Sequence, residues 1–470
     1  MNDPLIRPPL ESFSIKGLHG YKNIHIDFSG KSTVVVAENG TGKTTVLNAL
    51  NAFITRRFQR LASINFDSIE CKFRGSLLPI SISKAQLIAR RDDSVEVLAH
   101  LANGASVSEA ALSEFILNSY TPGAIRQFKE HPLVHQIWVN TPHDWDSLED
   151  VLNELHGTLD SSLTESARAV SEEVKGYMEN VEVIFLPTYR RIERPILRPG
   201  RARQPFSRRP PSGKPQHDDM AFGLADVQER LAQLSEDIER RSNIEYRNLS
   251  ARMLKDMLTG QDSSDNIDAS SLPDVNALGL FLSRVDRAAK STSSVMLNRI
   301  QQLYDTGNIH DTENKFLRYF LSQLAQVIEE TRETELVIEQ FVAICNSYLT
   351  LSSDEKSLAF DPKTLQVVVQ NTWSNDPISL EDLSSGEKQI VSLMSHLYLS
   401  DRPKLVLIDE PELSLSLDWQ RKVLPDIANS PTVVQLLAIT HSPFVFENEL
   451  DKFAAPLKVS RREKQKDATS

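Results

Sequence analysis

Residues 37–45 combine a lysine, two glycines and three threonines in a spacing that suits the binding of a phosphate chain. A loop of this composition directs backbone N–H groups and the positive end of the following helix toward phosphate oxygens. Lys43 would add a positive charge, and the hydroxyl of Thr44 would be a ligand for Mg²⁺. The nucleotide-binding residues expected in this loop are Asn39, Gly40, Thr41, Gly42, Lys43, Thr44 and Thr45.

The loop departs from the G-x-x-x-x-G-K-[ST] pattern at its first position, where Ala37 replaces glycine. The rest of the pattern is present, and Gly40 adds backbone freedom. Three valines before the loop and an Ala/Leu-rich segment after it predict a short buried strand, the loop, and a helix that starts at Lys43. A chance Gly-Thr-Gly-Lys turn is the alternative, and the flanking strand and helix disfavour it.

Two later apolar segments end in residues that suit phosphate chemistry. Leu405 to Ile408 leads into Asp409, which is suited to hold Mg²⁺ through water, and Glu410, which is suited to polarise the water that attacks a γ-phosphate. Two carboxylates can also simply end a strand. Val433 to Ile439 precedes His441, which can hydrogen-bond the γ-phosphate and sense its loss. Alone such a histidine is usually incidental, but its place after the acidic strand favours a role.

A fourth motif, LSSGEKQ at Leu383 to Gln389, opens a helix. Ser384, Ser385 and Gly386 stand just before it, so hydroxyls, backbone N–H groups and the helix dipole would point toward an anion. An ordinary helix cap looks similar over two residues. The Gly-Glu-Lys-Gln continuation makes the pattern more specific, and we count Ser384, Ser385 and Gly386 among the nucleotide-binding residues.

Composition places few other limits on function. The 470 residues have 40% hydrophobic and 25% charged side chains, as in an ordinary globular protein. The net charge of −12 argues against a protein that coats nucleic acid over its whole surface. Cys71 and Cys345 are far apart, with no cysteine or histidine near enough to complete a ligand cluster, which favours two reduced thiols. The chain shows no signal peptide and no membrane span, so we expect a cytoplasmic protein without membrane contact.

The elements that must position these motifs alternate between strands and helices. Residues 11–30 predict a strand pair that leads into the phosphate loop, with Tyr21 and Lys22 at its turn, where an exposed turn is a commoner explanation than contact with a base. A weaker helical region reaches residue 178 or so, and either Gln86 or Gln136 could be a γ-phosphate sensor. Further expected strands are Glu70 to Phe73, Ile80 to Ile82, Val95 to Leu98, Val181 to Arg191, Leu358 to Phe360, Leu365 to Val369 and Ile378 to Leu380.

The middle of the chain is expected to be helical after a basic segment. Arg190 to Lys214 holds nine Arg or Lys residues among prolines and glycines, which predicts a loop. A solvated linker and a contact for DNA or an acidic partner are equally good interpretations of it. Residues 221–259 carry a short coiled-coil seam at Leu224, Val227, Leu231, Leu234 and Ile238, and helices are expected around 276–305 and 313–349.

Together AENGTGKTT, LSSGEKQ, LVLIDEPELSL and ITHS resemble the nucleotide-binding heads of the ABC superfamily, above all its SMC-related branch. The resemblance covers residues 11–56 and 378–447 well and implies an α/β fold: an ABC-type, SMC-like P-loop ATPase head with a helical or short coiled-coil insertion. It divides the chain into 1–190, the N-terminal part of the head; 191–220, the basic loop; 221–350, the insertion; and 351–470, the C-terminal part.

Within that branch, FLPTYRRIE at 185–193, FGLADVQERL at 222–231 and ICNSYL at 344–349 resemble ATPases of anti-phage and abortive-infection systems, in particular the PtuA family of Septu systems. Some relatives carry a nuclease domain after the ATPase, and the chain ends too soon after His441 for one. The resemblance therefore implies ATP and Mg²⁺ as ligands and a separate HNH-type nuclease as partner.

In such heads the serine of the L-S-G-G-Q motif completes the ATP site of a second subunit. The alignment makes that serine Ser384 and puts Ser385 where the family has its first glycine. The resemblance thus implies a head-to-tail homodimer, or a higher oligomer of dimers, in which Ser384 acts on ATP held by the partner chain. Ser414 to Leu417 lie where a dimer-contact loop belongs.

Three functions remain open at this point. The favoured one is an ATP-hydrolysing regulatory subunit of an anti-phage complex, in which the dimer geometry controls the nuclease. A nucleotide sensor or scaffold with little hydrolysis is the second. An SMC-like DNA-repair ATPase is the third, although only 366 positions (409 − 43) and one brief seam separate Lys43 from Asp409, too few for long coiled-coil arms.

Overall fold

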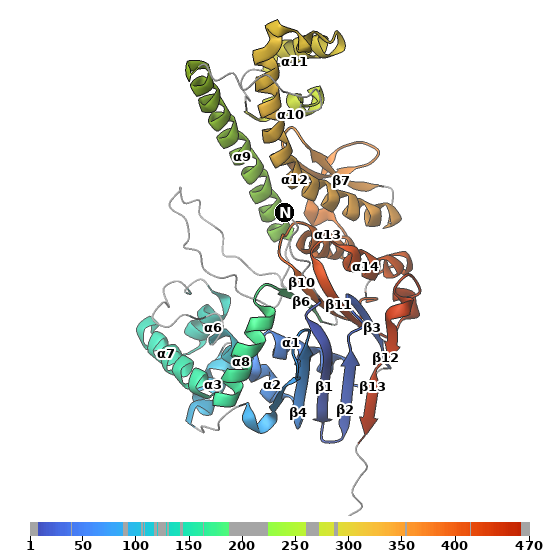
Figure 1. Ribbon diagram of the computed structural model, residues 1–470. Helices are drawn as coiled ribbons and strands as arrows, with labels where there is room; N and C mark the ends of the chain where they lie inside the picture. Colours follow the sequence, from blue (N-terminus) through green and yellow to red (C-terminus); the bar gives the residue numbers. More distant parts are fainter. Residues whose placement is uncertain are drawn as a thin grey trace, which may run out of the picture. The chain divides into compact units, whose positions relative to one another are not determined.

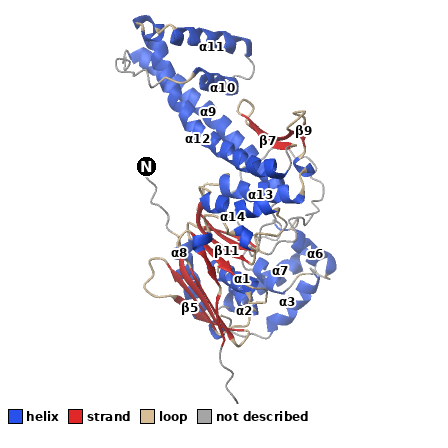
Figure 2. Cartoon of the chain, turned by 90° about the vertical axis from the view of Figure 1, so that its right-hand side faces the viewer, coloured by secondary structure: helices blue, strands red, loops and turns tan. Residues whose placement is uncertain are grey.

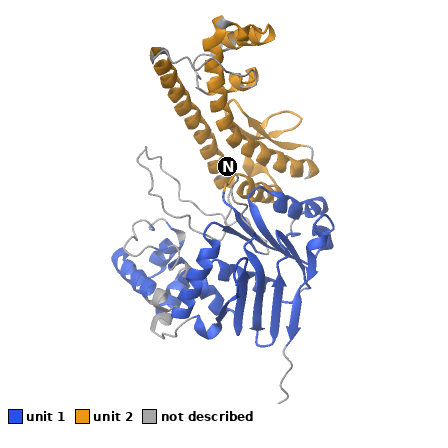
Figure 3. Cartoon of the chain, viewed as in Figure 1, with its two compact units in different colours: residues 1–221, 402–470 blue, residues 222–401 orange. Residues whose placement is uncertain are grey.

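The computed structural model describes residues 8–38, 40–87, 93–104, 107, 109–116, 120, 128, 131–141, 144–162, 164–187, 224–259, 272–285, 290–352, 355–413 and 415–461. The chain forms two compact units, which Figure 3 colours separately. Unit 1 comprises residues 1–221 and 402–470, and unit 2 comprises residues 222–401. The chain therefore returns to unit 1 at Arg402, whereas the sequence-based division placed all of 351–470 in one segment. The Arg190 to Lys214 segment lies outside the described residues.

Unit 1 contains an antiparallel sheet in the order β13-β2-β1-β4-β5 (Figure 1). The expected strand pair forms β1 and β2, in which Phe13 pairs with Ile26 and Ile15 with Ile24. Their buried apolar residues alternate with more exposed ones, as in a sheet with one face against a core. The strands are β1 (Leu10–Leu18), β2 (Lys22–Asp27), β4 (Ser68–Phe73), β5 (Ile80–Ser83) and β13 (Lys458–Arg461).

The second sheet of unit 1 has parallel strands in the order β12-β3-β11-β10-β6. Every residue of β10 is buried, which explains its unbroken apolar sequence. Because the strands are parallel, β3, β10 and β11 all end at the same edge of the sheet, where ligands of open α/β sheets bind. The strands are β3 (Ser32–Val36), β6 (Glu182–Leu186), β10 (Lys404–Asp409), β11 (Val433–Thr440) and β12 (Ala454–Pro456).

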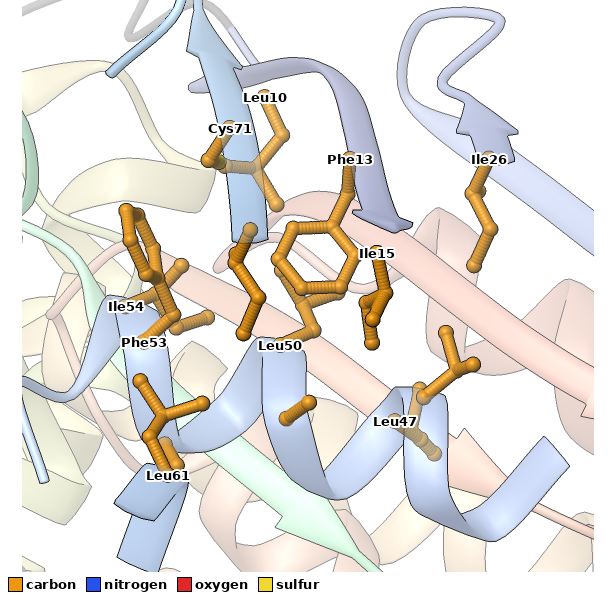
Figure 4. Close-up of a cluster of buried hydrophobic side chains, with 14 of the residues drawn as sticks. Leu10, Phe13, Ile15, Ile26, Leu47, Leu50, Phe53, Ile54, Leu61 and Cys71 are labelled. Atoms are coloured by element: carbon orange, nitrogen blue, oxygen red, sulfur yellow. The ribbon is translucent and has the colours of Figure 1, made fainter. Parts of the chain in front are cut away.

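Helices α1 (Lys43–Ile54) and α2 (Phe58–Ser63) contribute to the main core of unit 1. Figure 4 shows side chains of α1, including Leu50 and Phe53, turned toward those of β1. Phe53 meets Phe13 and Phe58 edge to face, at ring-centroid distances of 6.4 Å and 6.3 Å. Burying each such side chain, rather than leaving it exposed, contributes about 1.5–3 kcal/mol to the free energy of unfolding. This packing fixes α1, and with it the loop that precedes it.

A helical region of unit 1 has a separate apolar cluster, in which Trp138 stacks on Trp145. The prediction of a strand at Val95 to Leu98 is wrong, because these residues belong to α3. The buried Leu98, Leu101 and Ala102 recur at helical spacing and pack on this cluster, so the tertiary core overrides a short β-like sequence. The helices are α3 (Asp93–Gly104), α4 (Glu109–Glu114), α6 (Pro132–Asn140), α7 (Trp145–Ser162) and α8 (Glu165–Met178).

Unit 2 is mostly helical and carries a small three-stranded sheet (Figure 2). Leu231, Leu234 and Ile238 are buried on α9, which packs along α12, so the expected seam forms within the chain. The elements are α9 (Leu224–Thr259), α10 (Val275–Val285), α11 (Lys290–Asp305), α12 (Lys315–Ser352), β7 (Lys356–Asp361), β8 (Gln366–Asn371), β9 (Pro377–Ile378) and α13 (Ser385–Tyr398).

Cys71 and Cys345 are free and buried, and burial raises the pKa of both thiols. Of the helices within the described residues, none has the length and apolarity needed to cross a bilayer. Single-turn 3₁₀ helices lie at Lys84–Gln86, Asn308–His310, Thr312–Asn314, Leu380–Asp382, Pro443–Val445 and Asp451–Phe453.

Candidate nucleotide-binding site

The phosphate loop connects the end of β3 to the start of α1. Gly40 and Gly42 have φ angles of +79° and +103°, a region that side-chain-bearing residues rarely adopt, and Gly42 caps α1. The helix begins at Lys43, as predicted. Its first backbone N–H groups therefore face the loop, where they can bind an anion. Asn39 lies outside the described residues, while Thr41 and Thr45 occupy the loop and the first turn of the helix.

Ala37 occupies the position where the phosphate-loop pattern has glycine, and the structure explains why alanine is tolerated. Its φ angle is not in the positive region that favours glycine. Its N–H donates to the carbonyl of Thr440 at 3.1 Å, and its methyl group is buried in the main core. The substitution therefore introduces no backbone strain, and the main-chain hydrogen bond that ties the start of the loop to the end of β11 does not depend on it.

Lys43 and Glu410 form a largely buried ion pair at the same edge. Lys43 Nζ lies 3.0 Å from Glu410 Oε1, and the side chains are 5% and 17% exposed. Glu410 has a φ of +50°, an unusual backbone conformation for a residue with a side chain, and its N–H donates to the carbonyl of Ile439 at 2.8 Å. Strained backbone of this kind clusters at functional sites. The ion pair was not predicted from the sequence.

Thr44 and Asp409, the two residues expected to hold Mg²⁺, are hydrogen-bonded to each other. The hydroxyl of Thr44 donates to Asp409 Oδ2 at 2.6 Å, across 365 positions of sequence. Asp409 is buried at the end of β10. A hydroxyl and a carboxylate are hard oxygen ligands, and Mg²⁺ bound with nucleotide needs only one or two carboxylates besides phosphates and water. These two residues therefore fit the expected Mg²⁺ site.

His441 follows β11 and contacts a carboxylate that the sequence analysis did not assign to the site. Its Nδ1 lies 3.0 Å from Glu412 Oε1 and 3.8 Å from Glu410 Oε1. Glu412 is buried, and its Oε2 accepts a hydrogen bond from the hydroxyl of Thr440 at 2.8 Å. The sequence offered one sign that Glu412 belongs to the site, namely its place three residues after Asp409. That spacing could not reveal its contact with His441, which follows a different strand.

The turn between β1 and β2 also reaches the phosphate loop. Lys22 Nζ donates to the carbonyl of Gly40 at 3.1 Å, and the same ammonium lies 5.5 Å from the centre of the Tyr21 ring. Tyr21 is exposed. The turn therefore supports the loop directly, and contact of Tyr21 with a nucleotide base stays a prediction.

Ser384, Ser385 and Gly386 lie in unit 2, at the start of α13. Ser384 caps this helix: its hydroxyl accepts from the N–H of Glu387 at 3.3 Å, and its own N–H donates to Glu387 Oε2 at 2.7 Å. Lys356 Nζ lies 3.2 Å from the same Glu387 oxygen. Both serines are exposed. The helix start thus has a capping box and carries both serines on the surface of the unit, and their contact with an anion stays a prediction.

The charge of Glu387 is set by opposing effects. Burial raises the pKa of its carboxyl, while the hydrogen bond from the Ser384 N–H and the ammonium of Lys356 lower it. The net result is a pKa below the usual value. Glu387 therefore stays ionised and holds the Ser384 backbone in place at neutral pH.

Some expected residues are not joined to this edge. The side chain of Gln86 accepts from the N–H and hydroxyl of Ser83, and Gln136 is exposed on α6, so the choice of a γ-phosphate sensor stays open. Ser414 lies outside the described residues. Leu417, the last residue of the expected dimer-contact loop, begins α14 (Leu417–Asn429) and is exposed.

Fold and site together show an α/β unit with a phosphate loop at the edge of a parallel sheet, and a mostly helical unit inserted between its two sequence segments. The ABC-type, SMC-like class stays a prediction. Two family models match the chain. Residues 12–130 match a model described as "AAA domain", and residues 258–447 match one described as "AAA domain, putative AbiEii toxin, Type IV TA system". The two matches include the phosphate loop and the segments that carry Ser384, Asp409 and His441.

The chain is also similar to individual proteins. It is 27% identical over 176 residues to the Retron Vc95 probable ATPase of Vibrio cholerae serotype O1 biovar El Tor, a match covering 33% of this chain and 32% of the relative. The match thus spans about a third of that relative's length. The crystal structure of the SmcHead bound to the C-winged helix domain of ScpA matches at 12% identity and a TM-score of 0.31, covering 98% of this chain and 99% of that chain.

Proposed function

We propose that this chain binds ATP with Mg²⁺ and hydrolyses it as the regulatory ATPase subunit of an anti-phage defence complex. The observation that supports hydrolysis most strongly is the convergence of five side chains at the ends of three parallel strands. These side chains are the ammonium of Lys43, the hydroxyl of Thr44, the carboxylates of Asp409 and Glu410, and the imidazole of His441.

Each side chain has a distinct task in this proposal. Lys43 and the N–H groups of the loop bind the β- and γ-phosphates, and Thr44 with Asp409 would hold Mg²⁺, which would neutralise phosphate charge. Phosphates compete with Glu410 for Lys43, so binding of ATP opens the ion pair. Glu410 then polarises the attacking water.

The proposal includes a head-to-tail homodimer, from which higher oligomers could be built. Ser384 and Ser385 form an exposed, well-capped helix start in unit 2, whereas Lys43 and Glu410 lie in unit 1. Such a helix start can bind a phosphate that a second chain presents. In the dimer, Ser384 of each chain completes the ATP site of the other.

The role in defence is proposed from relatives rather than from the site. One family model carries a toxin-antitoxin description, and the Vibrio cholerae relative is named as a retron ATPase. The motifs that resemble the PtuA family of Septu systems favour a separate HNH-type nuclease as the regulated partner. Joint purification with an HNH protein encoded beside this chain, stable in ATP and weakened by Lys43→Ala, would support this part.

A second candidate function is a nucleotide sensor with little turnover. In this function the Lys43–Glu410 ion pair stays closed when ATP binds, and a carboxylate engaged by a buried ammonium is a poorer partner for water. The two candidates agree on ATP binding and differ only in what happens to the γ-phosphate.

Phosphate release by the wild type and by Glu410→Gln separates the two candidates. The hydrolysis proposal expects the variant to bind ATP at least as tightly while releasing phosphate about 10²–10⁴-fold more slowly. Glu447→Gln, which neutralises an exposed carboxylate in the same unit, is the matched control and should retain wild-type rates. If wild type and Glu410→Gln both bind ATP and are equally inactive, the sensor function is the correct one.

A further inference from the structure

Glu412 is a buried carboxylate at the phosphate edge to which the proposed hydrolysis gives no task. Its side-chain contacts go to two consecutive residues at the end of β11. Oε2 accepts from the hydroxyl of Thr440 at 2.8 Å, and Oε1 accepts from the backbone N–H of His441 at 3.2 Å. The same Oε1 lies 3.0 Å from His441 Nδ1. Glu412 thus contacts both the backbone N–H and the ring of His441.

We propose that Glu412 is a positioning residue that fixes the orientation and the tautomer of His441. Carboxylate oxygens accept hydrogen bonds, so an oxygen 3.0 Å from Nδ1 favours a proton on that ring nitrogen. The tautomer that this contact favours has its proton on Nδ1, and in the neutral ring Nε2 is then left as an acceptor. A buried acceptor that also holds the neighbouring backbone restricts the ring more firmly than an exposed contact would.

The distances from Glu410 and Glu412 to His441 indicate that these two carboxylates have different roles. Glu410 Oε1 is 3.8 Å from His441 Nδ1, beyond hydrogen-bonding distance, but 3.0 Å from Lys43 Nζ. Glu412 therefore holds the histidine, and Glu410 stays available for Lys43 and for the attacking water. This separation allows the ion pair with Lys43 to open without releasing His441.

The tautomer also determines which hydrogen-bond partner the Nε2 atom of His441 can take. A neutral ring with a bare Nε2 accepts a hydrogen bond and cannot donate one from that atom. It suits the O–H of the attacking water better than an oxygen of the γ-phosphate, which the sequence analysis assigned to it. This inference rests on the proposed hydrolysis for its consequence, whereas the tautomer itself can be measured without nucleotide.

The direct test is ¹⁵N NMR of the full chain with labelled histidine rings, in which His441→Gln identifies the His441 signals. The wild type should show a protonated Nδ1 and a bare Nε2. Glu412→Ala should shift His441 toward the Nε2–H form, while Glu412→Gln, whose amide oxygen can still accept, should keep the Nδ1–H form. Glu447→Ala, at an exposed carboxylate, should change nothing.

Several results would overturn the assignment. A bare Nδ1 in the wild type, or two protonated ring nitrogens at neutral pH, contradicts the tautomer. An Nδ1–H form that persists in Glu412→Ala shows that Glu412 does not set it. The wild-type spectrum alone decides the first point, so the proposal stays testable even if Glu412→Ala does not fold.

Kinetics then show whether Glu412 acts through His441. Glu412→Ala should lower kcat about 10–100-fold with KM little changed, and Glu412→Gln should restore part of that loss. Combining Glu412→Ala with His441→Ala should be no worse than His441→Ala alone, because both remove the same function. Multiplied effects would contradict a positioning role. If the wild type hydrolyses no ATP, the proposed function fails while the NMR result stands.

Discussion

The phosphate edge of unit 1 and the helix start of unit 2 hold their polar side chains in different ways. Thr44 and Asp409 are hydrogen-bonded partners 365 positions apart, and they meet only because a parallel sheet brings their elements together. Ser384 and Glu387 are three positions apart and need only a helix end. A tertiary fold builds the first region, whereas local capping builds the second.

The difference has a functional consequence. At the phosphate edge, charged groups neutralise one another inside the unit, as in the ion pair of Lys43 with Glu410. At the start of α13, the pairing of Ser384 with Glu387 stabilises the helix but leaves Ser384 and Ser385 exposed. The second region is therefore open to solvent, and in our proposal it meets ATP held by another chain.

The largest expected effect is on ATP hydrolysis, and it tests the difference between the phosphate edge and the exposed start of α13. Ser384→Arg should lower hydrolysis about 100-fold or more, because a donor to the phosphates is replaced by a bulky side chain at the helix start. ATP binding should persist, because Lys43 and the loop are untouched. The measurement is phosphate release together with binding of a fluorescent ATP analogue.

Ser374→Arg, at an exposed turn of unit 2, is the control for added charge and size. It should leave hydrolysis unchanged. Loss of ATP binding in Ser384→Arg would mean that the two regions do not have separate roles in binding and hydrolysis.

A smaller effect concerns the fold of unit 2 itself. Arg284 on α10 and Glu335 on α12 form an ion pair with side chains only 4% and 6% exposed, and Arg284 also donates twice to the carbonyl of Pro362. Arg284→Ala leaves the carboxylate buried without this partner and should cost about 3–5 kcal/mol of unfolding free energy. Urea denaturation measures the change.

Arg240→Ala is the control, because the side chain of Arg240 on α9 is 65% exposed and its guanidinium lies 3.9 Å from Asp237. An exposed pair of this kind should cost about 1 kcal/mol or less. Equal costs for the two variants would show that burial does not decide the strength of these pairs.

The smallest expected effect is a dependence of stability on pH. Because the pKa of Glu387 is lowered in the folded chain, its charge stabilises the fold above the ordinary value of 4.5, and this contribution is lost as the pH falls through the lowered pKa. Glu387→Gln should therefore be less stable than wild type at neutral pH and lose less stability on acidification. Urea midpoints measured across this acid range test the sign.

Glu381→Gln, at an exposed carboxylate just before α13, is the control and should keep the acid dependence of the wild type. An unchanged acid dependence in Glu387→Gln would show that the hydrogen bond from Ser384 and the ammonium of Lys356 do not stabilise the charge of Glu387.

Local patterns allowed much of this structure to be predicted. The valine strand, the helix start at Lys43, the all-buried β10 and the cap at Ser384 all follow from residues adjacent in sequence. The same local reasoning was wrong for Val95 to Leu98, where the core around Leu101 requires a helix.

Pairings between distant elements could not be predicted in this way. The contact of Glu412 with His441 depends on the register of β10 and β11, in which Asp409 pairs with Ile439. The pairing of Glu410 with Lys43 depends on β11 lying between β3 and β10. Neither register nor strand order is encoded in the spacing of a single motif.

The central claim is that two chains share each ATP pocket, and mixing two inactive variants tests this claim directly. Lys43→Ala should not bind ATP, and Ser384→Arg should bind it without turnover. Mixed in equal amounts, they form heterodimers with one intact pocket, so about a quarter of wild-type phosphate release should return. A mixture as inactive as either variant alone, with heterodimers shown to be present, would contradict the shared pocket.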